Sequence, residues 1–294
     1  MQWLAFFVMT AGAVVMVYPY LYAVGGSLKT RSEFAADKTG IVPPRYQPVT
    51  VWKRLVRAEP NPELDRQWRD WPPLRNYADA IGQGKIDRFL FNSLIYAVIV
   101  TAVSLFFNVL AAYAFARMEF PGRNFLFGLL LSTMMIPSAV LLVPQFIMIQ
   151  SMGLVDTLLG VVLPSFAGAF GIFLLRQFFL NIPRELEQAA ELDGCSRWGI
   201  LWHVVLPLSR PALITLGLFT FLGAWNSFEW PLVVLSNEDY YPLTVGLALF
   251  RDQNTQDWPR VLAATIMGTA PLIVLFYAAQ RFLVGGISLS GMKI

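Results

Sequence analysis

NIPRELEQAAELDGCSRWGILWHVVLPLSRP, residues 181–211, is the stretch that decides how this chain is organised. It is rich in Arg, Glu and Asp, although only 14% of the 294 residues are charged. Long apolar segments lie on both sides of it, each about as long as a membrane span requires. The stretch is therefore predicted to be a folded, water-facing connection between membrane helices.

The first half of this stretch predicts a short helix. Asn181 is a candidate N-cap, and Pro183 suits a first helical turn. Glu185 and Glu187 follow where the positive end of the helix dipole favours acids. Apolar residues at i, i+3 and i+4 form one narrow face, and these are Leu186, Ala189 and Ala190. Because its centre carries small side chains, we expect another surface to approach this face closely.

The second half predicts a break and a second helix. Asp193 and Gly194 are expected to end the first helix. Ser196 is a candidate cap for a second helix that runs toward Pro207. Residues 181–211 thus form two helices joined at Gly194, and we call them the elbow.

The composition of the whole chain independently indicates a membrane protein. Hydrophobic residues make up 56% and aromatic residues 14% of the sequence, and the mean hydropathy is +0.55. The net charge of +3 is small and the basic residues are scattered, which argues against nucleic-acid binding. The single cysteine excludes an intramolecular disulfide.

Apolar segments long enough to cross a membrane predict an all-α integral membrane protein with six transmembrane helices. The segments are residues 3–23, 89–115, 125–148, 158–175, 212–235 and 261–282. Prolines that are expected to kink or end spans are Pro137, Pro144, Pro164 and Pro231. A cleaved signal peptide is the alternative for residues 3–23, but the segment is long for one and no basic region precedes it.

This pattern divides the chain into three parts. Residues 1–27 hold the first transmembrane helix, residues 28–88 form an extracytoplasmic loop or small lobe, and residues 89–294 form a five-helix core that contains the elbow. The stretch from about 45 to 73 is either a specialised outer lobe or a tolerated insertion. Basic residues concentrate around the elbow and near the C-terminus, which places the elbow and both termini in the cytoplasm.

The elbow resembles the cytoplasmic loop of ATP-binding-cassette importer permeases, in which Glu-Ala-Ala is followed by Asp-Gly and then Leu-Pro. The matching residues are Pro183, Glu185, Leu186, Glu187, Gln188, Ala189, Ala190, Asp193, Gly194, Leu206 and Pro207. Gln188 departs from the usual Glu and carries no charge, and Glu187 points about 100° away around the helix. Further matches make the chain similar to carbohydrate importers of the maltose type, in their subunit with six transmembrane helices. These matches lie at residues 92–93, 112–117, 225–226, 280–282 and 291–293.

The resemblance implies a permease subunit for sugars or oligosaccharides in a bacterial inner membrane, working by alternating access. The implied partners are a second permease subunit, two nucleotide-binding ATPase subunits and an extracytoplasmic solute-binding protein. ATP and Mg would be bound by the ATPase subunits, and this chain would carry no catalytic, metal or cofactor site. In keeping with that, the sequence has no Gly-x-x-x-x-Gly-Lys-Ser/Thr loop. The residues implied in coupling to the ATPase subunits are Glu185, Glu187, Gln188, Ala189, Ala190, Asp193 and Gly194.

Trp225, Asn226 and Glu229 are candidates for the substrate pathway. Glu229 is the only acid between residues 212 and 235. Because a carboxylate at membrane depth costs about 2.5 to 3.5 kcal/mol, it is expected to face a cavity or a partner. The neighbouring aromatic rings suit stacking on sugars. The alternative is that Glu229 lies near the outer headgroups, with Trp230 as an interfacial anchor.

A secondary transporter or channel that works alone is the competing hypothesis. It predicts internal repeats, interrupted spans and intramembrane charges for ion coupling. Only Glu229 meets the last condition, and no repeat is evident in the sequence.

Overall fold

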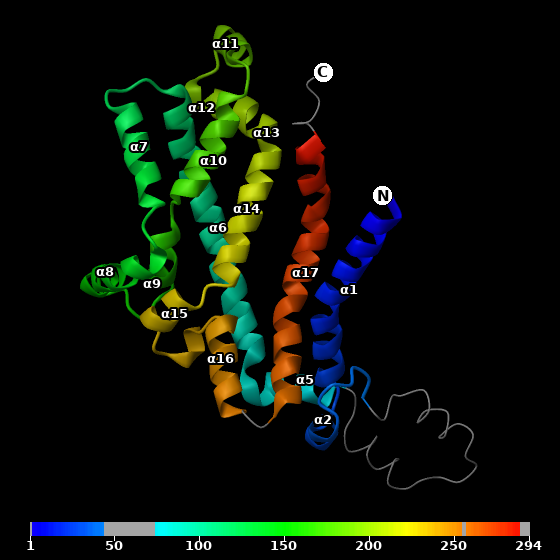
Figure 1. Ribbon diagram of the computed structural model, residues 1–294. Helices are drawn as coiled ribbons and strands as arrows, with labels where there is room; N and C mark the ends of the chain where they lie inside the picture. Colours follow the sequence, from blue (N-terminus) through cyan, green and yellow to red (C-terminus); the bar gives the residue numbers. More distant parts are fainter. Residues whose placement is uncertain (1, 44–73, 255–256, 289–294) are drawn as a thin grey trace. The chain divides into compact units, whose positions relative to one another are not determined.

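The computed structural model describes residues 2–43, 74–254 and 257–288, and every regular element within them is a helix (Figure 1). The α-helices are α1 (Gln2–Ser27), α2 (Arg31–Ala36), α5 (Arg75–Gly84), α6 (Ile86–Arg117), α7 (Arg123–Thr133), α8 (Ser138–Ser151), α9 (Leu158–Val162), α10 (Ala169–Leu180), α11 (Arg184–Leu192), α12 (Arg197–Ile200), α13 (Leu206–Leu208), α14 (Arg210–Trp225), α15 (Glu229–Val234), α16 (Leu243–Gln253) and α17 (Trp258–Ser288). Short 3-10 helices are η2 (Leu163–Ser165) and η4 (Glu238–Tyr240), and η3 (Leu201–Val205) is a π-helix. The prediction of an all-helical chain is confirmed.

Among the described residues, three helices are long and apolar enough to cross a membrane, and the number rises to six if each bent pair counts as one span. The three are Trp3–Ser27, Ile86–Arg117 and Trp258–Gln280. The bent pairs are α7 with α8 (103°), α9–η2 with α10 (45°), and Arg197–Leu208 with α14 (80°). We call Arg197–Leu208 the second arm of the elbow. The chain is therefore an all-helical membrane protein with three to six candidate spans.

The segments predicted at 125–148, 158–175 and 212–235 are not continuous helices, and prolines explain part of the difference. Pro137 precedes the first residue of α8, directly after the 103° bend, and Pro164 lies in η2 beside the 45° bend. The first break follows from the missing N–H of proline and its clash with the preceding turn, whereas the second lies at residues 166–168, just after Pro164. Pro144 instead lies inside α8 and does not end it. The third break, between α14 and α15, comes at residues 226–228 and precedes Pro231.

The chain divides into two compact units. The first comprises residues 1–88 and 246–271, and the second comprises residues 89–245 and 272–294. Of the predicted outer segment 28–88, residues 44–73 lie outside the described residues, as do the matches at 291–293. The division of the chain at residues 27 and 88 into three functional parts stays a prediction.

The core of the second unit packs α6 and α10 against the elbow and α14. Its buried residues are Val109, Ala112, Tyr113, Ala116, Ile172, Leu175, Phe179, Ile182, Ile200, Leu201, Val205, Ala212 and Leu216. Ala112 and Ala116 are 0% and 1% exposed, and small side chains of this kind let membrane helices approach closely. The second arm of the elbow and α6 therefore contribute buried side chains to the same core.

The elbow has the predicted break, with one difference at its start. Asp193 caps the C-terminus of α11, Gly194 has φ +85°, and the Ser196 hydroxyl accepts a hydrogen bond from the Gly199 N–H. The left-handed conformation at the turn is the reason for glycine there. Asn181, however, is not an N-cap: it ends α10 and its amide donates to the Gln177 carbonyl. Pro183 occupies the N-cap position of α11 instead.

Candidate functional site

Helix α11 projects at one end of the second unit, beyond the ends of α10 and α12 (Figure 1). The side chains on the outward part of the elbow include several large apolar ones. Leu186 is 46%, Leu192 90%, Trp198 60% and Trp202 54% exposed. Exposed apolar groups in this number mark a surface that binds another protein or lipid.

The predicted coupling residues are divided between the two faces of α11. Glu185, Gln188, Ala189, Asp193 and Gly194 are exposed. Ala190 is half-buried and packs on the core, and Glu187 is also half-buried. The predicted apolar face therefore does not act as one surface, because Leu186 and Ala189 are exposed while Ala190 packs inward.

The inward face of α11 is held by one arginine. Nε of Arg117, the last residue of α6, lies 2.6 Å from Oε1 of Glu187, and its Nη2 donates to the Ile182 carbonyl at 2.8 Å. The two side chains are only 7% and 13% exposed. Polar groups also line a small 170 Å³ cavity beside the pair, including Arg184, Gln188, Glu191 and Arg197.

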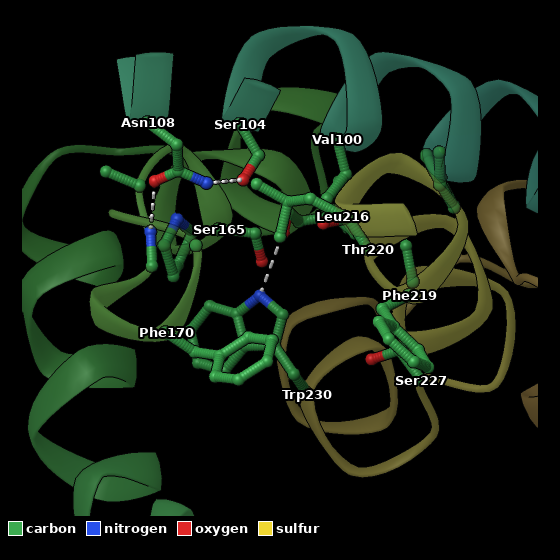
Figure 2. Close-up of a pocket in the computed structure, with 18 of the residues that line it drawn as sticks. Val100, Ser104, Asn108, Ser165, Phe170, Leu216, Phe219, Thr220, Ser227 and Trp230 are labelled. Carbon is green, nitrogen blue, oxygen red and sulfur yellow. Dashed lines mark hydrogen bonds between the residues drawn. The ribbon is translucent and has the colours of Figure 1, made fainter. Parts of the chain in front are cut away.

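A larger cavity of 480 Å³ lies within the second unit (Figure 2). Side chains from α6, α8, η2, α10, α14 and α15 line it. Its polar lining residues are Tyr96, Ser104, Asn108, Gln145, Ser165, Thr220, Ser227 and Trp230, and its aromatic ones also include Phe170 and Phe219. None of its lining residues is Asp, Glu, Lys, Arg or His. Its size is typical of small-molecule sites, and its lining offers hydrogen bonds and ring faces without charge.

Asn108 lines this cavity and makes two hydrogen bonds there. Its amide nitrogen donates to the Ser104 hydroxyl at 3.0 Å, and its amide oxygen accepts from the Gly168 N–H at 3.0 Å (Figure 2). Both side chains are almost fully buried, at 1% and 4% exposed. Gly171 leaves room for them, since a Cβ there would lie 2.4 Å from the Asn108 amide nitrogen. The indole N–H of Trp230 is shared between the carbonyls of residues 160 and 161, both at 3.2 Å.

Sequence reasoning missed these α6 residues, although a signal was present. Tyr96, Val100, Ser104 and Asn108 recur every four residues and therefore share one face of α6. A serine and an asparagine on one face of an apolar span point to a protein interior or a cavity. That periodicity is visible in the sequence.

The sequence-predicted pathway residues lie next to the cavity residues along the chain but are not among the residues that line it. Trp225 is 3% exposed and stacks on Phe221, with ring centroids 5.8 Å apart. Asn226 is exposed and its amide donates to the Leu222 carbonyl at 2.9 Å, at the end of α14. Glu229 is exposed in the first turn of α15, where the helix dipole favours an acid. Their contact with substrate stays a prediction.

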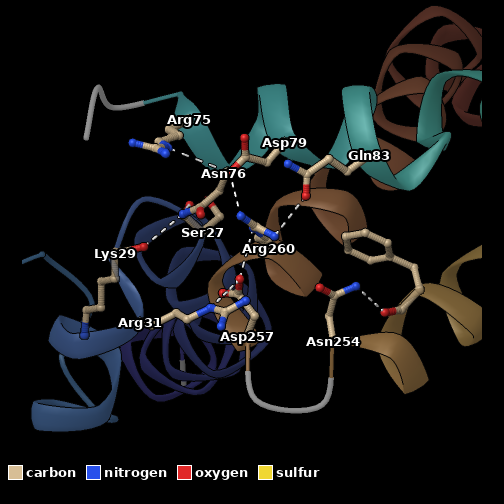
Figure 3. Close-up of polar contacts among 11 residues, drawn as sticks. Ser27, Lys29, Arg31, Arg75, Asn76, Asp79, Gln83, Asn254, Asp257 and Arg260 are labelled. Atoms are coloured by element: carbon tan, nitrogen blue, oxygen red, sulfur yellow. Dashed lines mark hydrogen bonds and ion pairs between the residues drawn. The ribbon is translucent and has the colours of Figure 1, made fainter. Parts of the chain in front are cut away.

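The first unit contains a separate polar cluster, which joins α1 and its following turn to α5 and α17 (Figure 3). The buried Asp257 carboxylate pairs with Arg31 at 2.7 Å and with Arg260 at 3.0 Å. Arg260 also reaches Asp79 at 2.9 Å. The Asn76 amide, fully buried, donates to the carbonyls of residues 27 and 29. These contacts tie chain segments together, and we assign them a structural role.

Lys29, in the turn between α1 and α2, is fully buried. Its ammonium donates to the carbonyls of Asp37 at 2.7 Å and Gly40 at 2.6 Å, and it lies 3.4 Å from the Asp37 carboxylate. The Gly40 N–H donates to the same carboxylate at 2.9 Å. That backbone hydrogen bond has the largest effect and holds the pKa of Asp37 below its ordinary value; desolvation opposes it, and the charge of Lys29 lowers the pKa further.

Comparison with known proteins gives one consistent family. The sequence model of the binding-protein-dependent transport system inner membrane component matches residues 108–288. The arabinooligosaccharides transport system permease protein AraQ of Halalkalibacterium halodurans is 36% identical over 202 residues, which are 69% of this chain and 72% of that protein. The sulfoquinovosyl glycerol transport system permease protein SmoH of Agrobacterium fabrum is 35% identical over 249 residues, 83% of this chain and 87% of that protein.

A solved structure shows the same fold. One chain of a bacterial ABC transporter involved in the import of the acidic polysaccharide alginate superimposes with a TM-score of 0.73 over 95% of both chains, at 23% identity. The family match sets aside the alternative of a transporter or channel that works alone. The chain belongs to the binding-protein-dependent transport system inner membrane components, and it is a multi-pass inner-membrane permease subunit of an ABC importer.

Proposed function

We propose that this permease imports uncharged sugars or oligosaccharides by alternating access, and that the 480 Å³ cavity lies on the substrate pathway. The single observation that carries the proposal is the cavity lining, which combines hydroxyl, amide and aromatic groups with no charged side chain. Sugars present hydroxyl groups for hydrogen bonding and apolar ring faces for stacking, so both kinds of lining group have a counterpart.

The absence of charge in the lining favours neutral substrates. An anionic sugar needs a cationic partner inside the membrane, because an unpaired charge there is costly. Relatives named for arabinooligosaccharides and diacetylchitobiose fit a neutral cavity. Relatives named for sn-glycerol-3-phosphate or sulfoquinovosyl glycerol handle substrates with an anionic group. We place this chain with the first kind.

The elbow is the part that we propose to be moved by ATP. Its exposed side chains Leu186, Leu192, Trp198 and Trp202 offer an apolar surface at one end of the second unit. We propose that two ATPase subunits, which bind ATP and Mg, grip this surface on the permease and on a second permease subunit. An extracytoplasmic solute-binding protein would deliver the sugar at the opposite side.

This mechanism requires six spans with the elbow and both termini in the cytoplasm. In this topology, α7 with α8 and α9–η2 with α10 each count as one span, and α14 crosses the membrane without residues 197–208 of the elbow. The basic residues that flank the elbow support the orientation. Residues 28–88 then lie outside, on the side from which the sugar arrives.

Uptake by the assembled importer in proteoliposomes tests the substrate class. Arabinotriose, diacetylchitobiose and sn-glycerol-3-phosphate are compared, each with the solute-binding protein that is encoded with the permease. We expect uptake of a neutral sugar and none of the phosphate ester. Uptake of the phosphate ester alone would show that the neutral assignment is wrong.

A pair of matched variants tests the cavity. Phe219 lines the cavity, and its side chain makes no hydrogen bond. Phe228 is also exposed, at 39% against 54% for Phe219, but it does not line the cavity. Phe219→Ala should raise the KM for the neutral sugar about tenfold, the effect of losing roughly 1.4 kcal/mol of ring contact. Phe228→Ala should leave the KM within about twofold of the wild type. Equal changes in KM in the two variants would contradict the proposal that the cavity lies on the substrate pathway.

A further inference from the structure

The contact between Arg117 and Glu187 joins the coupling helix to a cavity-lining helix. Arg117 is the last residue of α6, and Glu187 lies in the first turn of α11. The Nε–Oε1 distance is 2.6 Å, and the same guanidinium donates to the Ile182 carbonyl at 2.8 Å. One planar group therefore holds both the side chain of α11 and the backbone that leads into it, which the fork geometry of arginine allows and that of lysine does not.

The attachment is confined to one face of α11. Glu187 and Ala190, three residues apart and thus on the same face, are the residues of α11 that are half-buried. Ala190 makes an apolar contact with the core, whereas Glu187 makes the charged one. The rest of α11 is exposed and available to a partner. A push on the exposed face is therefore transmitted to the body of the second unit through these two contacts and through the second arm of the elbow.

Stability alone is a poor explanation for this ion pair. Taking two charges out of water costs about as much as their attraction returns, so apolar residues of similar size often hold a fold equally well. The neighbouring Ala190 and the buried side chains of the second arm already supply such apolar contacts. What a paired charge adds is a defined geometry, because the pair has one good arrangement and resists sliding.

Helix α6 leads from this ion pair to the cavity without interruption. The helix is continuous from residue 86 to Arg117, and Asn108 lies nine residues, or about 14 Å, from Arg117 along its axis. Asn108 in turn accepts the Gly168 N–H, at the residue that caps α10 beside the 45° bend. A displacement of α11 is thus connected by directional contacts to the break that borders the cavity.

We propose that Arg117 and Glu187 are positioning residues that transmit the movement of the coupling helix through α6 and Asn108 to the bend at Gly168. This inference rests on the proposed function, since it needs an ATPase subunit that moves α11. It assigns to this chain a specific mechanical connection, and it distinguishes Glu187, which points inward, from the exposed coupling residues Glu185 and Gln188.

Hydrogen–deuterium exchange of the assembled importer in nanodiscs tests the connection without a transported sugar. The probe is the exchange of peptides that cover residues 166–172, including the Gly168 N–H, compared between the nucleotide-free and the ATP–vanadate states. In the wild type we expect exchange in this segment to differ between the two states. In Arg117→Gln and in Glu187→Gln we expect that difference to shrink about tenfold, while the ATPase subunits still co-purify.

Controls on the same side of the second unit separate this effect from a general loss of charge. Glu119→Gln and Arg123→Gln remove charges within six residues of Arg117, and they should keep the full difference. Arg117→Lys should keep part of it, since lysine retains the charge but not both contacts. The variant with both Arg117→Gln and Glu187→Gln should be no worse than either single variant, because one contact is lost in all three.

The outcomes are distinguishable. A wild type that brings no ATPase subunit with it contradicts the proposed function itself. A wild type with ATPase subunits but no nucleotide-dependent difference at residues 166–172 overturns the connection, as does a Glu187→Gln variant that keeps the difference. If Arg117→Gln does not insert, Glu187→Gln decides, because glutamine has nearly the shape of glutamate but lacks the negative charge that pairs with Arg117. A merely structural pair would change exchange equally in both nucleotide states.

Discussion

Gly194→Asp is the substitution that separates coupling from folding most cleanly. Gly194 has φ +85°, and a Cβ added there would meet nothing within 4 Å. The substitution therefore causes no clash and acts through the backbone and through charge. A non-glycine residue in the left-handed region costs about 1 to 2 kcal/mol, and aspartate, which Asp156 shows in this conformation, lies at the low end, about 1 kcal/mol. A negative charge just after the C-terminus of α11 adds about 0.3 to 1 kcal/mol of unfavourable interaction with the helix dipole.

The sum, about 1.3 to 2 kcal/mol, acts on the single turn between α11 and α12. It is a minority of the roughly 5 to 15 kcal/mol that keeps a typical domain folded, so the permease should still fold and insert. On the population of the correctly formed turn at Gly194, however, the same free energy is a factor of about ten to thirty. We expect the variant to be present at wild-type levels in the membrane while uptake falls by about tenfold or more.

The assay compares uptake of a neutral sugar with ATP hydrolysis in proteoliposomes. Gly122→Asp is the matched control, since Gly122 also has a left-handed φ, +77°, with open space around its Cβ, but lies at the start of α7. The control should transport within about threefold of the wild type. Normal uptake by Gly194→Asp would refute the reasoning, and equal losses in the two variants would show that strain at any turn is sufficient.

Further predictions concern the cavity and the first unit. Gly171→Ala should displace the Asn108 amide, which its Cβ would approach to 2.4 Å, and we expect a loss of about 2 kcal/mol in the free energy of unfolding together with reduced uptake, measured by thermal unfolding in detergent and by transport. Asp257→Ala leaves the exposed Arg31 and the half-buried Arg260 without their shared carboxylate, although Arg260 keeps Asp79, and should destabilise the protein by about 1 to 3 kcal/mol; a thermal unfolding temperature within 1 to 2 °C of the wild type, about the noise of the method, would contradict this. Because the folded pKa of Asp37 is lowered, its contribution to stability is present above the ordinary pKa of 3.8 and is lost as the pH falls through the lowered value, so in Asp37→Asn the unfolding temperature should fall less than in the wild type as the pH is lowered below 3.8.

Much of the architecture could be predicted from local pattern. The elbow, its break at Gly194 and the cap at Ser196 follow from residues that are close in sequence, because helix starts and stops are decided by backbone groups within one turn. Apolar runs located the three long helices Trp3–Ser27, Ile86–Arg117 and Trp258–Gln280 for the same reason. The break at Pro137 was also predictable, since proline acts on its own backbone.

Local pattern did not identify the side chains that line the cavity. Trp225, Asn226 and Glu229 stand out as polar or aromatic residues in an apolar run, but the cavity is lined instead by their neighbours Ser227 and Trp230. The break at residues 226–228 turns the chain between α14 and α15, so the helical spacing that relates these residues no longer holds across it. Which side chain faces a cavity depends on that turn.

By itself, the sequence determined that this chain crosses a membrane, that it is helical, and where its elbow bends, because hydropathy and helix capping are properties of short segments. Only the tertiary structure decided that Glu187 turns inward to Arg117, 70 residues away, and that Asn108 reaches the backbone of Gly168 across the cavity wall. Those pairings depend on how separate helices pack, and packing joins side chains whose distance along the chain carries no information about their distance in space.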